Sequence, residues 1–164
     1  MTRMLLALGS IILLGCPVVH AVDKPGALYV ASVSCERGPL SLQMGRSLQA
    51  LRDLGPVLSE EMEKTDVIDA EARVLRFEGL TIHVLFPAND YSKGLIESAE
   101  ISSPRWTVSR GVKVGMSLEA LSKNLKRKLT MANSSAEICG DADCVTLQFA
   151  RGRVRHIKYV CYTG

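Results

Sequence analysis

The chain contains few aromatic residues and few histidines: its 164 residues include one tryptophan, three phenylalanines, four tyrosines and three histidines. Its basic residues are not interleaved with aromatic side chains, the arrangement that holds phosphates while bases stack, so nucleic-acid binding is not expected. The charged fraction of 23% and the formal net charge of +3 are ordinary, and neither points to a particular class of partner.

The sequence also lacks the local signatures of common enzymes. It contains no G-x-S-x-G or H-E-x-x-H motif, no calcium-loop spacing and no carboxylate pair that stands out for acid–base catalysis. After the N-terminal segment only two histidines follow, His83 and His156, and each falls within a predicted strand. We expect both on the sheet surface. The sequence therefore predicts a protein that is not an enzyme and that binds no metal or cofactor.

A hydrophobic run long enough to remain as a membrane helix is missing. The apolar run over residues 4–14 is shorter than the roughly 18 to 20 residues that span a bilayer. It follows Arg3 and precedes V-H-A at residues 19–21, which together predict a signal peptide over residues 1–21, cleaved before Val22. We expect a periplasmic or secreted protein. The alternative is an outer-membrane lipoprotein, because L-L-G-C at residues 13–16 resembles a lipobox that would leave Cys16 lipidated, and only then would the chain contact a membrane.

Of five cysteines, four follow the signal peptide: Cys35, Cys139, Cys144 and Cys161. Four cysteines in an oxidising compartment predict two disulfides with three connectivities. Cys139 and Cys144 flank the turn sequence G-D-A-D and would face each other across a hairpin, which leaves Cys35 to pair with Cys161. The main alternative pairs Cys144 with Cys161, and a zinc site made from the four thiols is a minor one.

A repeated motif organises the rest of the chain. L-Q-M-G-R-S-L-Q-A-L at residues 42–51 returns as V-K-V-G-M-S-L-E-A-L at residues 112–121. In each copy a glycine, Gly45 or Gly115, allows a turn, and a serine, Ser47 or Ser117, stands where the N-cap of a helix belongs. No second glycine or P-loop lysine follows, so a structural turn is expected rather than a phosphate loop.

The repeat divides the mature chain into a lead-in (residues 22–37, with a strand near 27–33), unit 1 (38–103), a connector (104–110) and unit 2 (111–164). We expect a helix after each motif, a second short helix within 56–72, and strands over residues 73–77, 80–86, 95–101, 136–139, 144–150 and 153–162. In the last strand Val154, Ile157 and Tyr159 break the alternation, which predicts a bulge. The predicted fold is α+β: two tandem helix-plus-antiparallel-strand repeats share one sheet, with the helices on one face.

Charge is distributed unevenly between the two halves. Residues 22–102 contain 8 basic and 13 acidic side chains, whereas residues 103–164 contain 11 basic and 4 acidic ones. The basic second half would favour an anionic partner, such as lipopolysaccharide or an acidic protein. The simpler interpretation is that two unlike halves have solvated surfaces.

The two motifs, residues 42–47 with Leu51 and residues 112–117 with Leu121, resemble the β-lactamase inhibitory protein family and its single-unit relatives, the small outer-membrane assembly lipoproteins of the SmpA/OmlA type. The resemblance covers roughly residues 38–161. It implies the fold described above, and the spacing of Cys139 and Cys144 is similar to that family's disulfide position. The inhibitors bind through an aromatic-rich sheet, which this chain lacks, so β-lactamase is not the expected target.

These observations predict an exported, non-enzymatic protein-binding module, an inhibitor or immunity-type protein acting on another envelope or secreted protein. The alternative is an envelope-assembly accessory, anchored through Cys16. The candidate partner-binding residues lie in loops of a rigid sheet, where recognition residues often occur: Asp90, Tyr91, Trp106, Asp141 and Asp143. Each has a structural alternative, since Trp106 would also fill the seam between units and aspartates are common turn formers.

Overall fold

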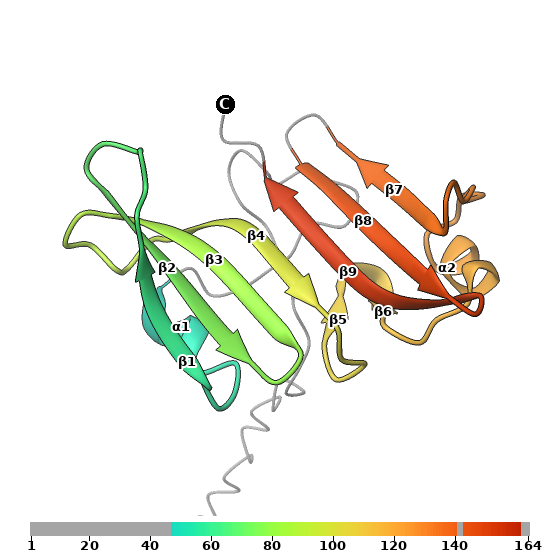
Figure 1. Cartoon of the computed structure of the whole chain (residues 1–164), viewed down its shortest axis with the longest axis horizontal. Coiled ribbons are helices and arrows are strands. Elements are labelled where there is room, and N and C mark those ends of the chain that lie inside the picture. Colours follow the sequence, from blue (N-terminus) through green and yellow to red (C-terminus); the bar gives the residue numbers. More distant parts are fainter. Residues whose placement is uncertain (1–46, 141–142, 162–164) are drawn as a thin grey trace, which may run out of the picture.

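A seven-stranded antiparallel sheet forms the body of the molecule (Figure 1). The computed structural model describes residues 47–140 and 143–161. The strand order is β1-β2-β3-β4-β9-β8-β7, and a two-stranded ribbon, β5 with β6, lies beside the sheet. In chain order the elements are α1 (Leu48–Arg52), β1 (Ser59–Glu63), β2 (Ala70–Phe77), β3 (Leu80–Pro87), β4 (Leu95–Ile101), β5 (Thr107–Val108), the 3₁₀ turn η1 (Ser109–Gly111), β6 (Val112–Lys113), α2 (Leu118–Asn124), β7 (Ser135–Cys139), β8 (Asp143–Ala150) and β9 (Arg153–Cys161).

Both helices begin at the serines that the sequence predicts as N-caps. The Oγ atom of Ser47 accepts a hydrogen bond from the backbone N–H of Ala50 at 3.1 Å, and Ser117 does the same for Ala120 at 3.2 Å. Each bond satisfies one of the amides that have no partner in the first turn of a helix. Because the helices are short, their stability depends on the leucines that they bury rather than on helix propensity.

The covered face of the sheet forms the core. One row of directly paired residues crosses six strands, and every member belongs to a single apolar cluster: Leu75, Ile82, Ala99, Tyr159, Val145 and Ile138. Leu51 of α1 and Leu121 of α2, both 0% exposed, belong to the same cluster. The predicted α+β fold with an antiparallel sheet is therefore confirmed. The opposite face, which we call the open face, presents His83, Ser98 and Val160 along the neighbouring row.

The prediction of a second short helix within residues 56–72 is wrong. Residues 59–63 form the edge strand β1, which pairs with β2 from Ser59 opposite Arg76 to Glu63 opposite Ala72. The few apolar residues here fit either period poorly, and ladder hydrogen bonds to β2 decide in favour of the strand. The six strands predicted between residues 73 and 162 are present, with ends that shift by up to three residues. The strand predicted near residues 27–33 lies outside the described residues.

The predicted bulge in the last strand is confirmed. Gln148 pairs with His156 and Phe149 with Val154, so Arg155 of β9 has no partner on β8. The strands predicted on either side of residues 78–79 and of residues 151–152 pair as hairpins. At the first of them Gly79 has φ +71°, and a Cβ atom there would lie 2.3 Å from the Cβ of Ser103, so no larger residue fits without a shift.

Cys139 and Cys144 face each other across the β7–β8 hairpin at a Cα–Cα distance of 4.0 Å, which is compatible with the predicted disulfide. The alternative pairing of Cys144 with Cys161 is not formed. Cys161 is buried and disulfide-bonded. Its predicted partner Cys35 lies outside the described residues, as does Cys16, so that pairing stays a prediction. Within the described residues, no helix has the length and apolar character needed to cross a membrane.

Candidate functional site

Of the predicted partner-binding residues that the structure describes, Asp90 is the exposed one. Its Oδ1 atom accepts hydrogen bonds from the backbone N–H of Ser92 at 2.9 Å and from the Ser92 hydroxyl at 2.6 Å. These bonds, the hydroxyl first, lower the pKa of the Asp90 carboxyl. The side chain thus shapes the β3–β4 loop, as aspartates in turns commonly do.

Tyr91 fastens this loop to the body of the protein. Its hydroxyl donates to Glu71 Oε2 at 2.6 Å and accepts from Arg73 Nη2 at 3.2 Å, while its ring packs edge-on against Phe86. Its backbone carbonyl accepts a hydrogen bond from the N–H of Leu48 at the start of α1. Tyr91 is therefore half-buried and mostly engaged within the fold.

Next to Tyr91, two arginines and a glutamate link α1 to the sheet edge. Glu60 of β1 accepts from Arg52 at 2.8 Å and from Arg73 at 2.8 Å. The hydrogen bond from Arg52 is the main cause of the lowered pKa of Glu60, and Arg73 adds to it. This network neutralises a half-buried carboxylate, so Glu60 is unavailable to a partner.

Trp106 and Asp143 are both 1% exposed. The indole N–H of Trp106 donates to the carbonyl of Glu78 at 2.8 Å, and the ring meets Phe77 edge-on with centroids 5.8 Å apart. Neither side-chain oxygen of Asp143 has a hydrogen-bond partner, and burial raises the pKa of its carboxyl. A partner could reach neither residue without local opening. Asp141, the remaining candidate, lies outside the described residues.

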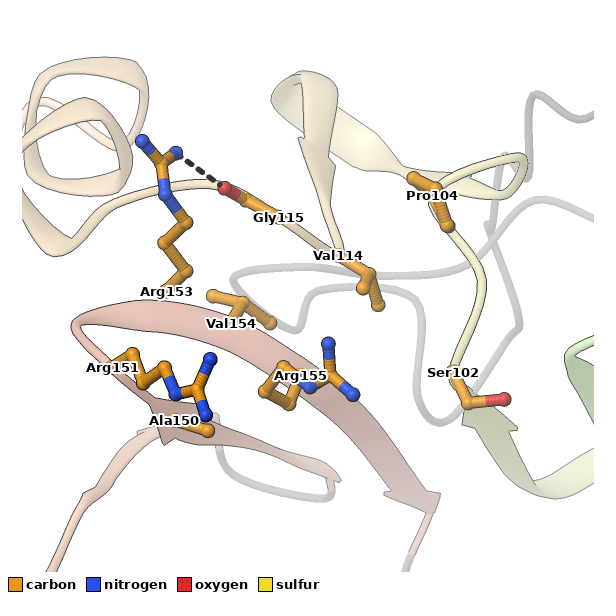
Figure 2. A pocket seen from close by; sticks show the side chains of 9 residues that line it. All are labelled: Ser102, Pro104, Val114, Gly115, Ala150, Arg151, Arg153, Val154 and Arg155. Atoms are coloured by element: carbon orange, nitrogen blue, oxygen red, sulfur yellow. Dashed lines mark hydrogen bonds between the residues drawn. The ribbon is translucent and has the colours of Figure 1, made fainter.

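The structure instead forms a cavity of about 620 Å³ that three arginines line, Arg151, Arg153 and Arg155 (Figure 2). Four segments meet there: the stretch after β4, the turn after β6, the β8–β9 hairpin and the first residues of β9. Val114 and Val154 lie between the arginines and Pro104 in Figure 2. The cavity therefore combines cationic groups with apolar walls. We call it the arginine cavity.

Hydrogen bonds hold the segments of the arginine cavity together. The N–H of Gly115 donates to the carbonyl of Val154 at 2.8 Å, and the N–H of Val154 donates to the carbonyl of Met116 at 2.9 Å. Arg153 Nη1 also donates to the carbonyl of Gly115 at 2.9 Å (Figure 2). Residues 115–117 thus lie against β9 like a short added strand, and Arg153 is oriented by this contact.

The bulge affects the direction of Arg155. In a regular strand, residues two apart share a face, but an inserted residue leaves the ladder and turns its side chain away from that alternation. Figure 2 shows the side chains of Arg151 and Arg155 on either side of Val154. Both arginines are exposed. The guanidinium group of Arg153 is instead directed toward the carbonyl of Gly115, so the three arginines reach the cavity in different directions.

Electrostatically, the arginine cavity is a site for an anion. None of its lining residues carries a carboxylate. Among the described ion pairs, none includes Arg151, Arg153 or Arg155. The lining contains one hydroxyl, on Ser102, and no histidine, so it offers binding groups and no acid–base pair. R-G-R-V-R at residues 151–155 is the sequence signal for this cluster, which the strand prediction alone did not reveal.

The two histidines lie on the open face, as predicted, each beside a glutamate. His83 Nδ1 is 3.3 Å from Glu63 Oε2, and His156 Nε2 is 3.6 Å from Glu100 Oε2. Among the described residues, the one group with metal-ligand spacing is Glu137 with Cys139 and Cys144. Its two sulfurs lie at disulfide distance, and sulfurs joined in a disulfide are not the thiolates that zinc binds.

Exposed apolar side chains occur along residues 58–68, which we call the edge segment: Leu58 precedes β1, Met62 lies on β1, and Val67 and Ile68 lie in the β1–β2 loop. Leu58, Met62, Val67 and Ile68 are 69%, 66%, 48% and 87% exposed. They are four of the five exposed large hydrophobic residues in the part of the chain that the structure describes. Leu58 and Met62 lie in the stretch predicted as a second short helix, and the observed strand replaces that prediction.

Comparison with known proteins identifies no family for the chain. No family model matches it, and no curated protein is found to be similar. Among solved structures, the chain is similar to the uncharacterized protein yfeY from Escherichia coli, with a TM-score of 0.41 and 13% sequence identity. The match covers 82% of this chain and 98% of yfeY.

Proposed function

We propose that the protein is an exported, non-enzymatic protein-binding module of the inhibitor or immunity type, acting on another envelope or secreted protein. The observation that carries this proposal is the edge segment. Single exposed hydrophobic residues are common, but a group of them on one element marks interaction sites. Here four side chains that are about half to nearly fully exposed occupy one edge of the sheet.

The edge segment suits a partner in two ways. β1 is the outermost strand, so its outer backbone groups can pair with a strand of another protein. Its exposed residues also include several carboxylates: Glu61, Glu63, Asp66 and Asp69. Because side chains alternate along a strand, Met62 points to the opposite face from Glu61 and Glu63. A partner at this edge would therefore meet carboxylates on one face and apolar groups on the other. This favours a partner that is both basic and apolar, because opposite charges increase the rate of encounter and buried side chains supply most of the affinity.

Replacing Met62 with lysine tests this surface. The variant places a cation among the apolar anchors, and we expect the affinity for the partner to fall at least tenfold, which corresponds to a loss of about 1.4 kcal/mol or more. The immobilised protein captures partners from an envelope extract, and the dissociation constant of each purified partner is measured with wild type and variant. Ile68→Lys should act in the same direction, because Ile68 is 87% exposed.

Met131→Lys is the matched control. Met131 is the fifth exposed hydrophobic residue of the described chain, 46% exposed, and it lies outside the edge segment. The Met131→Lys variant should retain wild-type affinity for the partner. A captured partner that binds wild type, Met62→Lys and Met131→Lys equally would exclude the edge segment as the binding surface. Absence of any specific partner in the extract would count against a protein-binding role.

We also propose that the chain consists of two tandem copies of one unit, related to the inhibitory protein family by its motifs. The matching N-caps Ser47 and Ser117 support this interpretation. In each half a helix precedes a three-strand meander, β2-β3-β4 or β7-β8-β9, and the final strands β4 and β9 pair antiparallel with each other. A duplicated unit that joins through its own last strand would produce this order.

Export itself is tested by the intact mass of the mature protein, measured after thiol alkylation without reductant. We expect a chain that begins at Val22, is lighter by four hydrogens and carries no alkylated thiol, because Cys35, Cys139, Cys144 and Cys161 form two disulfides. A diacyl or triacyl group on Cys16 would favour the alternative proposal, an envelope-assembly accessory anchored in the membrane. Labelled thiols in the mature chain would contradict the predicted disulfides.

A further inference from the structure

We infer that the arginine cavity is a second binding site, specific for a phosphate monoester that carries an apolar group. This site is separate from the edge segment and does not depend on the proposed protein partner. It would recognise the phosphate by charge and by hydrogen bonds from guanidinium groups, and the remainder of the ligand by contact with the apolar walls.

The charge of the site matches a dianion better than a single carboxylate. Three arginines line the arginine cavity, and none of its lining residues is acidic. None of the described ion pairs includes these arginines, and a bound anion would offset their positive charge. A phosphate monoester carries about −1.5 to −2 charges at neutral pH and offers three acceptor oxygens. Guanidinium forks bind such oxygens in pairs, which makes arginine a preferred phosphate ligand.

The remaining walls of the arginine cavity account for the apolar group. The walls include Val114, Val154 and Pro104, which cannot bind an anion. The volume of about 620 Å³ lies within the range of roughly 300 to 1,000 Å³ that is typical of sites for organic ligands. Inorganic phosphate would leave most of this space to water. An ester with an aromatic or alkyl group would fill it and gain from the burial of apolar surface.

The arrangement exists before a ligand binds. Arg153 is held by the carbonyl of Gly115, and backbone hydrogen bonds link Val154 to Gly115 and Met116. A site fixed in this way loses less conformational entropy on binding than one built from unconstrained loops. Arg151 and Arg155 have no such contact among the described interactions, and these two would close on the phosphate.

Calorimetric titration of the full mature protein with inorganic phosphate, phenyl phosphate and phenol tests the inference. Phenyl phosphate should bind most tightly, inorganic phosphate more weakly, and phenol not measurably. Raising the salt concentration should weaken the binding of both anions, because mobile ions screen exposed charges. Vesicles of phosphatidylcholine with phosphatidic acid, tested in parallel, distinguish a lipid headgroup from a soluble ester as the source of the phosphate.

Two variants and a matched control locate the site. Arg151→Gln or Arg155→Gln should raise the dissociation constant for phenyl phosphate about tenfold each, and the double variant about a hundredfold, the loss expected for hydrogen bonds to a charged group. Both side chains are exposed, so the melting temperature should not change. Arg127→Gln removes one positive charge outside the lining and should leave the dissociation constant unchanged.

Several outcomes would overturn the inference. The first is that neither phenyl phosphate nor the vesicles bind in a phosphate-dependent way. The second is equal affinity for phenyl phosphate and phenol. The third is that Arg127→Gln loses as much affinity for phenyl phosphate as the double variant does. The last result would show attraction by the net charge of the protein rather than by the arginine cavity.

Discussion

Replacing Trp106 with alanine should lower the free energy of unfolding by about 3 to 5 kcal/mol, the usual cost of removing a large buried side chain. Trp106 is among the largest fully buried side chains of the described residues. It belongs to the same apolar cluster as Leu51 and Leu121, so its loss leaves a cavity where the connector meets the core. Natural domains are stable by about 5 to 15 kcal/mol, and the variant therefore loses a large part of its stability.

Urea denaturation followed by circular dichroism measures this loss. Trp106→Phe is the informative companion: it keeps a ring against Phe77 but removes the N–H that donates to Glu78, so we expect a cost of about 1 to 3 kcal/mol. Leu58→Ala, at a side chain that is 69% exposed, should change stability by less than about 0.5 kcal/mol. A Trp106→Ala variant as stable as Leu58→Ala would show that the connector does not pack onto the core in solution.

Asp143→Asn should stabilise the protein at neutral pH by about 1 to 3 kcal/mol, because the substitution removes the charge of a buried group that no hydrogen bond compensates. In the wild type a carboxylate is 1% exposed and neither of its oxygens accepts a hydrogen bond. A buried ion without a partner is expensive, and its pKa shifts to favour the neutral form. The amide is nearly the same shape and carries no charge.

The pH dependence of Asp143→Asn has a definite sign. Burial raises the pKa of the Asp143 carboxyl in the folded protein. At pH values between the pKa of Asp143 in the unfolded state and its pKa in the folded state, the folded protein binds more protons than the unfolded one. The free energy of unfolding therefore falls as pH rises through this interval. The advantage of the asparagine variant should be absent below about pH 3.5, where aspartate is protonated in both states, and should grow as pH rises to 7.

The comparison is made by denaturation of wild type and Asp143→Asn at a series of pH values. Because both proteins contain the same Glu60 network, its loss of stabilisation at acid pH cancels in the difference. Glu137→Gln on β7 is the control, since Glu137 is exposed and should have little effect at any pH. An advantage of equal size at pH 3 and pH 7 would refute the explanation by a buried charge.

Local patterns predicted the elements whose cause is local. The N-caps Ser47 and Ser117 were predictable because a serine before an apolar helix stripe has one dominant use. The hairpins at residues 78–79 and 151–152 and the bulge at Arg155 were predictable because strand alternation shows where the period of two is interrupted. Each of these inferences needed only residues a few positions apart.

The burial of the candidate partner-binding residues could not be predicted from the sequence, because exposure is a property of the whole fold. Tyr91 and Trp106 have the composition of interface residues, yet their partners in the structure, Glu71 and Glu78, lie 20 and 28 residues away. The sequence around Asp143 is typical of a turn, but the register of β8 places this residue on the covered face opposite Cys161. No local pattern distinguishes a displayed aromatic residue from one that fills the core.

The sequence by itself determined that the second half is basic, that each motif begins a helix at a serine, and where most strands lie, because composition, capping and alternation act over a few residues. Tertiary structure decided the rest. It made residues 59–63 an edge strand by offering β2 as a partner, and it brought Pro104, Val114 and Arg155 to one cavity from separate segments. The physical reason is that strand pairing and cavity walls depend on contacts between residues distant in the chain, which only the folded molecule brings together.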